Sequence, residues 1–422
     1  MLLFAQPTTW KAPYAIPAGK GVGFYSNEAK REQKDGNYHA AVTLAAHTLL
    51  SEPKRGQIAE AQDVLRESYD LAISLTDERV ALINQRGEIF QGDTTANECY
   101  ETVRLLKEAI AFTELLQQVP AELFLPVKKK DLPIVLAFND YMAKLADVEQ
   151  ELALVREQCA AMHYQRATIL AQGRSVSDNR TAAQKFAMSL SYVPDYSDAK
   201  ERFEEARRKG TTHLRIEPLD DQIDVRRFGN PGRAASFETN GRLLNAGVNN
   251  LPFFQLVGLN DPDPSEGGLV VCRGVIIKVD VKHEALYTTI DSTYQEKTID
   301  KQIIDSEDNP KTIKEKVLVW GKYKEFTKSA VCTVQYTVQI VDPLTNRMLQ
   351  TQSFTSTNRW DASWKRKLSG PDEAFADSYK REFVAPEPAY IGDIVFLDET
   401  ARGDIAQKMT NMLLQYAQSV GR

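Results

Sequence analysis

The stretch AVCTVQYTVQIV, residues 330–341, decides the fold of the C-terminal half of this chain. Apolar residues alternate there with threonine and glutamine. Successive side chains of a strand point to opposite faces of a sheet, so the pattern predicts a half-buried antiparallel strand with one lightly covered face. The residues predicted to be buried are Cys332, Val334, Tyr336, Val338 and Ile340.

The sequence on both sides of this strand predicts a sheet with helices. Residues 342–346 are typical of a turn, and 347–355 would form the returning strand of a hairpin. Residues 295–316 are rich in charge, and we expect a loop or a hairpin tip there. We expect further strands at 213–217, 254–259, 269–281 and 316–326, and helices at 234–249 and 404–416.

The N-terminal half has a different apolar period. Between residues 24 and 209 apolar residues recur every three or four positions, as in Cys99, Val103, Leu106 and Ile110, which is the spacing of amphipathic helices. At Lys209-Gly210 the period changes from 3.6 to 2, and glycine after a basic helix end is a C-cap signal. The chain is therefore predicted to be α+β. It would have a helical domain at 24–209 and an α/β domain with a mainly antiparallel sheet and flanking helices at 210–422.

A repeated spacing occurs at both ends of the helical half. Small or aromatic residues and a proline share the offsets 0, 4, 7 and 12 in two places, 141 positions apart, close to four units of 34. The spacing resembles the second helix of a tetratricopeptide repeat, in which small residues let the paired helix approach. The middle of the half does not show the pattern clearly, and a non-repeating helical bundle is the alternative. The two sets are Ala41, Ala45, Thr48 and Pro53, and Ala182, Phe186, Ser189 and Pro194.

Composition narrows the classes of partner. The chain has 422 residues and a net charge of −6, with acids and bases mixed along it, whereas a nucleic-acid binder would more often carry a basic face. No stretch reaches the roughly 18 apolar residues of a membrane span. The first residues, MLLFAQP, are similar to the end of a secretory signal. We therefore expect a periplasmic or outer-membrane-associated protein whose export signal is truncated here, with a cytoplasmic location as the alternative.

Sites for catalysis, metals and cofactors were sought by their motifs. The chain contains no Gly-x-Ser-x-Gly, no His-Glu-x-x-His and no phosphate-binding Gly-x-x-x-x-Gly-Lys motif. Its five histidines are scattered, and its four cysteines form no Cys-x-x-Cys pair. We expect no enzyme activity, no cofactor and no metal. The cysteines are predicted to be buried thiols, with Cys272 and Cys332 as candidate neighbours in the sheet.

The most unusual local feature is NRWDASWKR at residues 358–366. Tryptophan beside arginine and lysine can form a binding patch, because aromatic faces attract cations and indoles dominate many interfaces. The candidate interaction patch consists of Arg359, Trp360, Trp364 and Lys365. The alternative is that both indoles simply cover the edge of the sheet.

The order of elements in the C-terminal half resembles a known group. The chain has DYSDA at 195–199, a strand ending at Glu217-Pro218, further strands at 254–259, 273–276, 317–323 and 331–341, and Trp360 and Trp364 before a closing helix. This order resembles the bacterial envelope lipoprotein superfamily that includes the curli-secretion protein CsgG and the penicillin-binding-protein activator LpoB. The resemblance implies an envelope protein that binds partners, and some members of the group oligomerise.

The chain also departs from that group. It shows no lipid-anchor cysteine in this numbering, and helical repeats occupy its N-terminal half. We see no pair of long alternating hairpins, and the charges of residues 286–305 argue against a pore. We therefore expect a non-enzymatic adaptor of the bacterial cell envelope that binds protein partners on its helical array, with self-association through the C-terminal domain. The alternatives are a subunit of a secretion or assembly channel, and a hydrolase of envelope polymers.

Overall fold

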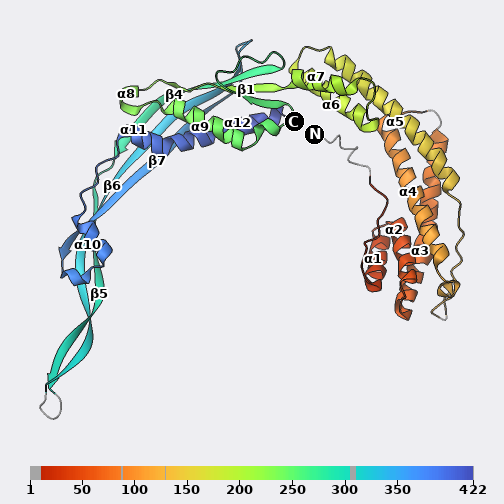
Figure 1. The fold of residues 1–422 in the computed structure, drawn as a ribbon, viewed down its shortest axis with the longest axis horizontal. Coiled ribbons are helices and arrows are strands. Elements are labelled where there is room, and N and C mark those ends of the chain that lie inside the picture. Colours follow the sequence, from red (N-terminus) through yellow and green to blue (C-terminus); the bar gives the residue numbers. More distant parts are fainter. Residues whose placement is uncertain (1–10, 87–88, 129, 305–309, 422) are drawn as a thin grey trace. The chain divides into compact units, whose positions relative to one another are not determined.

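The structure is a computed structural model that describes residues 11–86, 89–128, 130–304 and 310–421. Its contacts divide the chain into two compact units, Met1–Arg207 (unit 1) and Arg208–Arg422 (unit 2). Helices make up unit 1, and strands with flanking helices make up unit 2 (Figure 1). The predicted α+β class is therefore confirmed. The N-terminal MLLFAQP segment lies outside the described residues.

Unit 1 is a run of helices in which neighbours along the chain pack together. Two short helices open it, three long ones follow, and two shorter ones close it. The helices are α1 (Val22–Lys34), α2 (Tyr38–Leu50), α3 (Arg55–Arg86), α4 (Asp93–Gln118), α5 (Met142–Ala171), α6 (Val176–Tyr192) and α7 (Ala199–Gly210), with a 3₁₀ turn, η1 (Ala121–Phe124), after α4.

The predicted small-residue seams are buried. Ala41 on α2 and Ala182 on α6 have no exposed surface, and neither has Phe186. Three side-chain pairs in hydrogen-bond contact are 34 positions apart: Ser26 with Glu60, Gln33 with Glu67, and Tyr164 with Asp198. In the middle, α3, α4 and α5 have 32, 26 and 30 residues. A 34-residue unit holds two helices, so these long helices do not follow such units.

Unit 2 contains a seven-stranded sheet. Its strands are β1 (Thr212–Ile216), β2 (Asp220–Asp221), β3 (Phe254–Val257), β4 (Gly268–His283), β5 (Tyr287–Ile304), β6 (Pro310–Asp342) and β7 (Arg347–Ser369). Its helical segments are α8 (Val225–Phe228), α9 (Pro231–Asn245), η2 (Val248–Asn250), η3 (Asp372–Ala374), α10 (Asp377–Val384), α11 (Asp393–Phe396), a π-helical turn, η4 (Leu397–Ala401), and α12 (Arg402–Val420).

The sheet is mainly antiparallel in its long strands. Along it the order is β3-β1-β4-β6-β5, with β2 beside β4 and β7 beside β6. The short strands β1, β2 and β3 make parallel pairs, whereas β4, β5 and β7 all run antiparallel to β6. Strand β6 therefore connects the long part of the sheet.

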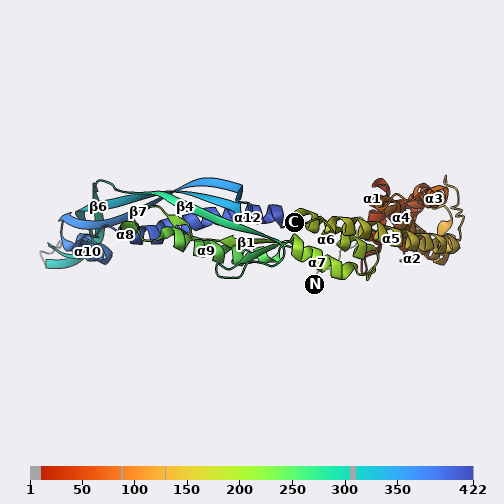
Figure 2. The same cartoon turned by 90° about the horizontal axis from the view of Figure 1, so that it is seen from above.

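The core of unit 2 lies on one face of this sheet. The predicted alternation is confirmed, because the even-numbered side chains from Cys332 to Ile340 are buried and the odd-numbered ones between them are not. Helices α9 and α12 cover the buried face, and Leu243 and Met409 pack into the same core (Figure 2). Burial of this apolar surface supplies the main driving force for folding.

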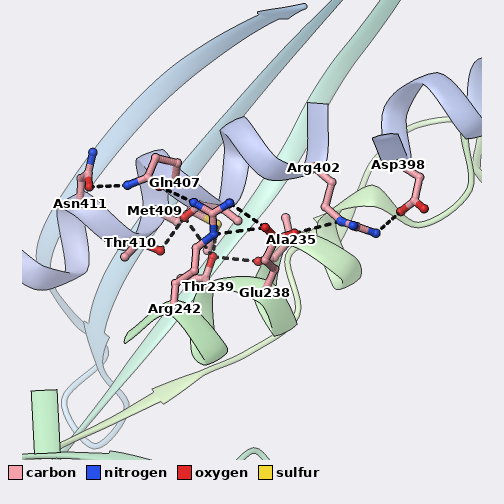
Figure 3. A network of polar contacts seen from close by, with 11 residues as sticks. Ala235, Glu238, Thr239, Arg242, Asp398, Arg402, Gln407, Met409, Thr410 and Asn411 are labelled. Carbon is pink, nitrogen blue, oxygen red and sulfur yellow. Dashed lines mark hydrogen bonds and ion pairs between the residues drawn. The ribbon is translucent and has the colours of Figure 1, made fainter. Parts of the chain in front are cut away.

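A polar network joins α9 to α12 (Figure 3). The Glu238 carboxylate accepts hydrogen bonds from Arg242 at 2.7 Å and from Arg402 at 2.9 Å. Arg402 also binds Asp398 at 2.6 Å, and inside the pair Thr239 donates to the backbone carbonyl of Ala235 at 2.8 Å. Burial raises the pKa of Glu238, but the two guanidinium groups outweigh it and hold the pKa below its ordinary value.

Two expectations for the middle of unit 2 are wrong. The strands expected at 316–326 and 330–341 are one continuous strand, β6. The loop expected at 295–316 is mostly strand, because β5 and β6 pair without a break from Tyr287 with Thr327 to Ile304 with Pro310. A hairpin, the alternative expected there, is thus present, but its paired strands are much longer than a hairpin tip. Its connection, residues 305–309, lies outside the described residues.

The four cysteines are buried and unpaired, as predicted. Burial raises the pKa of the Cys272 thiol to about 12 and that of Cys332 to about 11. The two are not sheet neighbours, since Cys272 lies opposite Ile340 and Cys332 lies opposite Val281. None of the helices in the described ranges combines the length and apolar character needed to cross a membrane.

A glycine in β6 tests how α10 and η3 are fixed to the sheet. The ring of Phe375 lies against Gly321, and a Cβ there would penetrate the ring. We expect Gly321→Ala to displace Phe375 and to lower the free energy of unfolding by about 1–3 kcal/mol, because the site is already filled. Urea denaturation followed by circular dichroism measures this loss.

Gly241 provides the matched control for this substitution. It lies inside α9, and no atom is within 4 Å of the position where a Cβ would stand. Gly241→Ala should therefore leave the stability unchanged or raise it by up to about 1 kcal/mol, since alanine favours helix. Equal destabilisation by both variants would contradict the packing described.

Candidate interaction surfaces

The candidate interaction patch lies on β7. Successive side chains of a strand point to opposite faces, so Trp360 and Trp364 lie on one face and Arg359 and Lys365 on the other. The sequence spacing placed the four residues near each other along the chain. The pleat of the strand separates the indoles from the cations, so the structure does not bring all four together on one face.

The two tryptophans pack within unit 2. Trp364 is only 6% exposed, and its ring stacks on Phe326 with centroids 5.2 Å apart and planes 9° apart. The ammonium group of Lys328 lies 5.3 Å from the Trp364 ring centre. Trp360 packs against the core of the sheet with its ring 6.2 Å from that of Tyr390. These contacts correspond to the alternative in which the indoles cover the sheet.

The two cations of the patch have partners within the chain. Arg359 binds Glu284 at 2.7 Å and Asp361 at 2.8 Å. Lys365 binds Glu382 at 2.9 Å, and its ammonium group lies 4.6 Å from the ring centre of Tyr379. A partner that used these cations would first have to compete with these internal contacts.

A second surface is formed by the long hairpin, which we call the ribbon: β5 and its partner residues 310–327 of β6. Strand β7 pairs with β6 only from Lys322 onward, and β4 pairs with it from Ala330. Within the described residues, the part of the ribbon beyond Lys322 and Ser292 therefore has two strands and two unpaired edges, and the ribbon runs past α10 (Figure 1). Unpaired edges present backbone N–H and C=O groups to a partner strand.

One face of the ribbon carries exposed apolar side chains. Tyr294 and Trp320 lie opposite each other with ring centroids 4.8 Å apart, and Trp320 is 57% exposed. Ile290 and Leu318 are exposed on the same face. Lysines 316, 322 and 324 also point to this face by strand alternation. The face thus carries apolar side chains among charged ones, with Lys316 paired to Glu296 at 3.0 Å. On the opposite face Phe375 covers Gly321.

A third surface lies along α3 in unit 1. The connection between α4 and α5 does not leave the unit but returns along α3, and we call residues 131–140 of it the strap. The Arg66 guanidinium donates to the carbonyl of Leu132 at 3.0 Å, and the Tyr69 hydroxyl donates to that of Ala137 at 2.8 Å. One turn earlier, Gln62 donates to the carbonyls of Leu123 and Leu125, at 2.7 and 2.8 Å.

The strap is extended, and the side chains of residues 134–136 point alternately towards α3 and towards solvent. Ile134 and Leu136 pack against the core of unit 1, whereas Val135 between them is 90% exposed. Pro133 disfavours helical backbone at the preceding residue, Leu132, which helps to keep the strap extended. A hollow of about 390 Å³ lies between the strap and α3, lined among others by Leu65 and Asp70. We call this part of α3, from Gln62 to Asp70, the α3 groove.

Two buried histidines form polar contacts between helices of unit 1. His39 Nε2 lies 2.8 Å from the Thr76 hydroxyl, and burial lowers the pKa of His39 to about 4. His163 Nε2 lies 2.7 Å from the Asp93 carboxylate, which also accepts a 2.8 Å hydrogen bond from Tyr192. These contacts join α2 to α3, and α4 to α5 and α6. No group of three metal-ligating side chains comes together in the described part of the chain.

Comparison with known protein families and with curated proteins finds no match to this chain. The surfaces must therefore be interpreted from their own geometry. The sequence analysis did not predict the strap. The short apolar run Ile134-Val135-Leu136 after Pro133 was the signal available for it.

The two tryptophan environments predict losses of stability of different size on truncation. Trp364→Ala should lower the free energy of unfolding of unit 2 by about 3–5 kcal/mol, because it removes a buried ring and leaves a cavity. Trp320→Ala should cost about 1 kcal/mol or less, since only its contact with Tyr294 is lost. Urea denaturation of both variants beside the wild type measures the difference; similar losses would show that the packing differs from that described.

Proposed function

We propose that this protein is a non-enzymatic adaptor of the bacterial cell envelope that binds protein partners through its helical unit. The observation that supports this proposal is the α3 groove, where an extended segment of chain is held against a helix. Three side chains on α3, Gln62, Arg66 and Tyr69, donate hydrogen bonds to backbone carbonyls of that connection. Contacts to the backbone plus alternate side-chain pockets are the way proteins bind extended peptides.

The arrangement of helices favours the same role. Stacked helices bury a continuous core and leave long side surfaces for binding. Unit 1 has its own core around Leu44, Leu65 and Phe112, and unit 2 has a separate core around Leu214 and Val334. Each unit can therefore carry its own partner. The proposed location in the envelope rests on the resemblance of the C-terminal half.

Separate expression of the units tests the division of roles. We expect residues 208–422 alone to unfold cooperatively, because the core of unit 2 is complete within that range. The fragment should lose most of the proteins that the full chain captures from bacterial envelope extract, as identified by mass spectrometry. Residues 1–207 alone should retain them. If residues 208–422 capture every partner of the full chain, the helical unit is only a spacer.

A second candidate function is that of a subunit in a larger assembly. The ribbon favours it, because two unpaired strand edges on one hairpin can each accept a strand from another copy. Isolated two-stranded hairpins are marginally stable in water, so pairing with a further strand would stabilise the ribbon. In this second candidate function, unit 2 associates with unit 2 of another copy of the chain, and unit 1 binds the protein partner.

Shortening the ribbon tests self-association. Gln295 lies opposite Val319, so residues 295–319 can be replaced by an Asn-Gly turn that joins Tyr294 to Trp320 in register. We expect the full chain to show oligomers that increase with concentration in size-exclusion chromatography with light scattering, and the shortened chain to be monomeric. Trp320→Ser, which keeps both edges, is the control. A full chain that stays monomeric at all concentrations would contradict this candidate function.

A further inference from the structure

We infer that the α3 groove is an exchangeable binding site: a partner's extended segment, with aliphatic residues at alternate positions and a basic flank before them, replaces the strap. This inference rests on the proposed adaptor function and specifies its partner. The strap is the occupant of the groove in this structure, so its own sequence shows which chemistry the groove accepts.

The polar contacts of the groove do not depend on the identity of the bound side chains. Arg66 and Tyr69 donate to main-chain carbonyls, at Leu132 and Ala137, which any peptide could supply. The Tyr69 side chain is itself 3% exposed, and burial raises its pKa to about 12, so its hydroxyl remains a donor at neutral pH. A segment from another chain in the same extended conformation can therefore satisfy the same donors.

The apolar contacts select the side chains at alternate positions. Ile134 and Leu136 point into the groove, and Val135 points to solvent. The hollow of about 390 Å³ beside them is within the range of volumes that hold ligands, about 300–1,000 Å³. The strap thus leaves unfilled space that larger aliphatic or aromatic residues of a partner would occupy.

The charged residues of the α3 groove determine which residues should precede the aliphatic positions of a partner segment. Lys128, just before the strap, binds Asp63 of α3 at 2.6 Å. Asp63 and Asp70 line the hollow together with Arg66, which lies 3.6 Å from Asp131 of the strap. On α3 the groove therefore presents two carboxylates and one guanidinium group. A partner segment with lysine or arginine before its aliphatic residues complements this set.

The strap has few backbone–backbone contacts, as an exchangeable segment requires. In the described residues from 132 to 140, one backbone–backbone hydrogen bond fixes it, from the Ile134 N–H to the Phe124 carbonyl at 3.0 Å. Leu132 and Val135 are 80% and 90% exposed. Because the strap is tethered at both ends, it competes at an effective concentration in the millimolar range. A separate segment therefore binds the intact protein weakly and binds a protein with a displaced strap much better.

A synthetic peptide tests the exchange. The probe is a fluorescein-labelled peptide with the sequence of residues 130–141, KDLPIVLAFNDY, and binding to the full chain is followed by fluorescence anisotropy. The strap is released by the double substitution Ile134→Asp, Leu136→Asp. We expect the released protein to bind the peptide at least tenfold more tightly than the wild type does. A peptide carrying the same two aspartates should bind neither protein.

Variants of the groove show where the peptide binds. On the released background, Tyr69→Phe removes one hydroxyl donor and should weaken peptide binding about two- to tenfold, the usual effect of one hydrogen bond. Leu82→Ala, at an exposed position on α3 outside the groove, should leave binding unchanged. If the aspartate variant does not fold, as judged by circular dichroism, replacement of residues 131–140 with a Gly-Ser segment of equal length takes its place.

The outcomes separate this inference from the proposed function. Failure of the folded, strap-released protein to bind the peptide better than the wild type would overturn the exchange, and so would equal binding by the aspartate peptide. If that happens while residues 1–207 still capture the partners of the full chain, the adaptor function stands and the partners use another face. Loss of capture by unit 1 would instead refute the adaptor function, whatever the peptide does.

Discussion

Unit 2 depends on one unbroken strand. Strand β6 pairs with β4, β5 and β7, so the register of all the long strands is defined against it. Its pleat presents Cys332, Val334 and Tyr336 to the helices, and a slip by one residue would turn this apolar face to the other side. The helices α9 and α12 pack on that face and are joined by the network around Glu238 (Figure 3). The sheet pairing, the core and the helix contacts therefore all require the same register of β6.

The sequence predicts those parts of the fold in which one face is buried and the other is in water. The alternation at residues 330–341 was sufficient to place the strand, and the small residues Ala41 and Ala182 were sufficient to locate buried helix contacts. The two strands within residues 295–316 were not predicted, because this part of the ribbon has water on both faces and its charged residues therefore follow no simple period. Pairs such as Lys316 with Glu296, at 3.0 Å across the strands, stabilise it only once the partner strand is present.

The candidate sites, too, could be predicted only in part from the sequence. Arg359, Trp360, Trp364 and Lys365 are close in sequence, but the period of two divides them between two faces, and only the geometry of β7 reveals this. The strap escaped prediction for another reason: a loop bound to its own helix depends on contacts between residues about 65 positions apart, as with Arg66 and Leu132. Local spacing cannot encode such contacts. The strap and the ribbon, which the structure revealed, are the surfaces that carry the proposals.

The continuity of β6 has a mechanical consequence. Hydrogen bonds between antiparallel strands lie across the strand axes, so tension along the ribbon loads the bonds from β6 to β4 and β7 in shear, many at a time. A hairpin pulled open from its end would lose its bonds one after another instead. A force applied along the ribbon is therefore transmitted to the core of unit 2 without first breaking the strand hydrogen bonds one at a time. In this respect β6 is a tension member that links the far end of the ribbon to the helices α9 and α12.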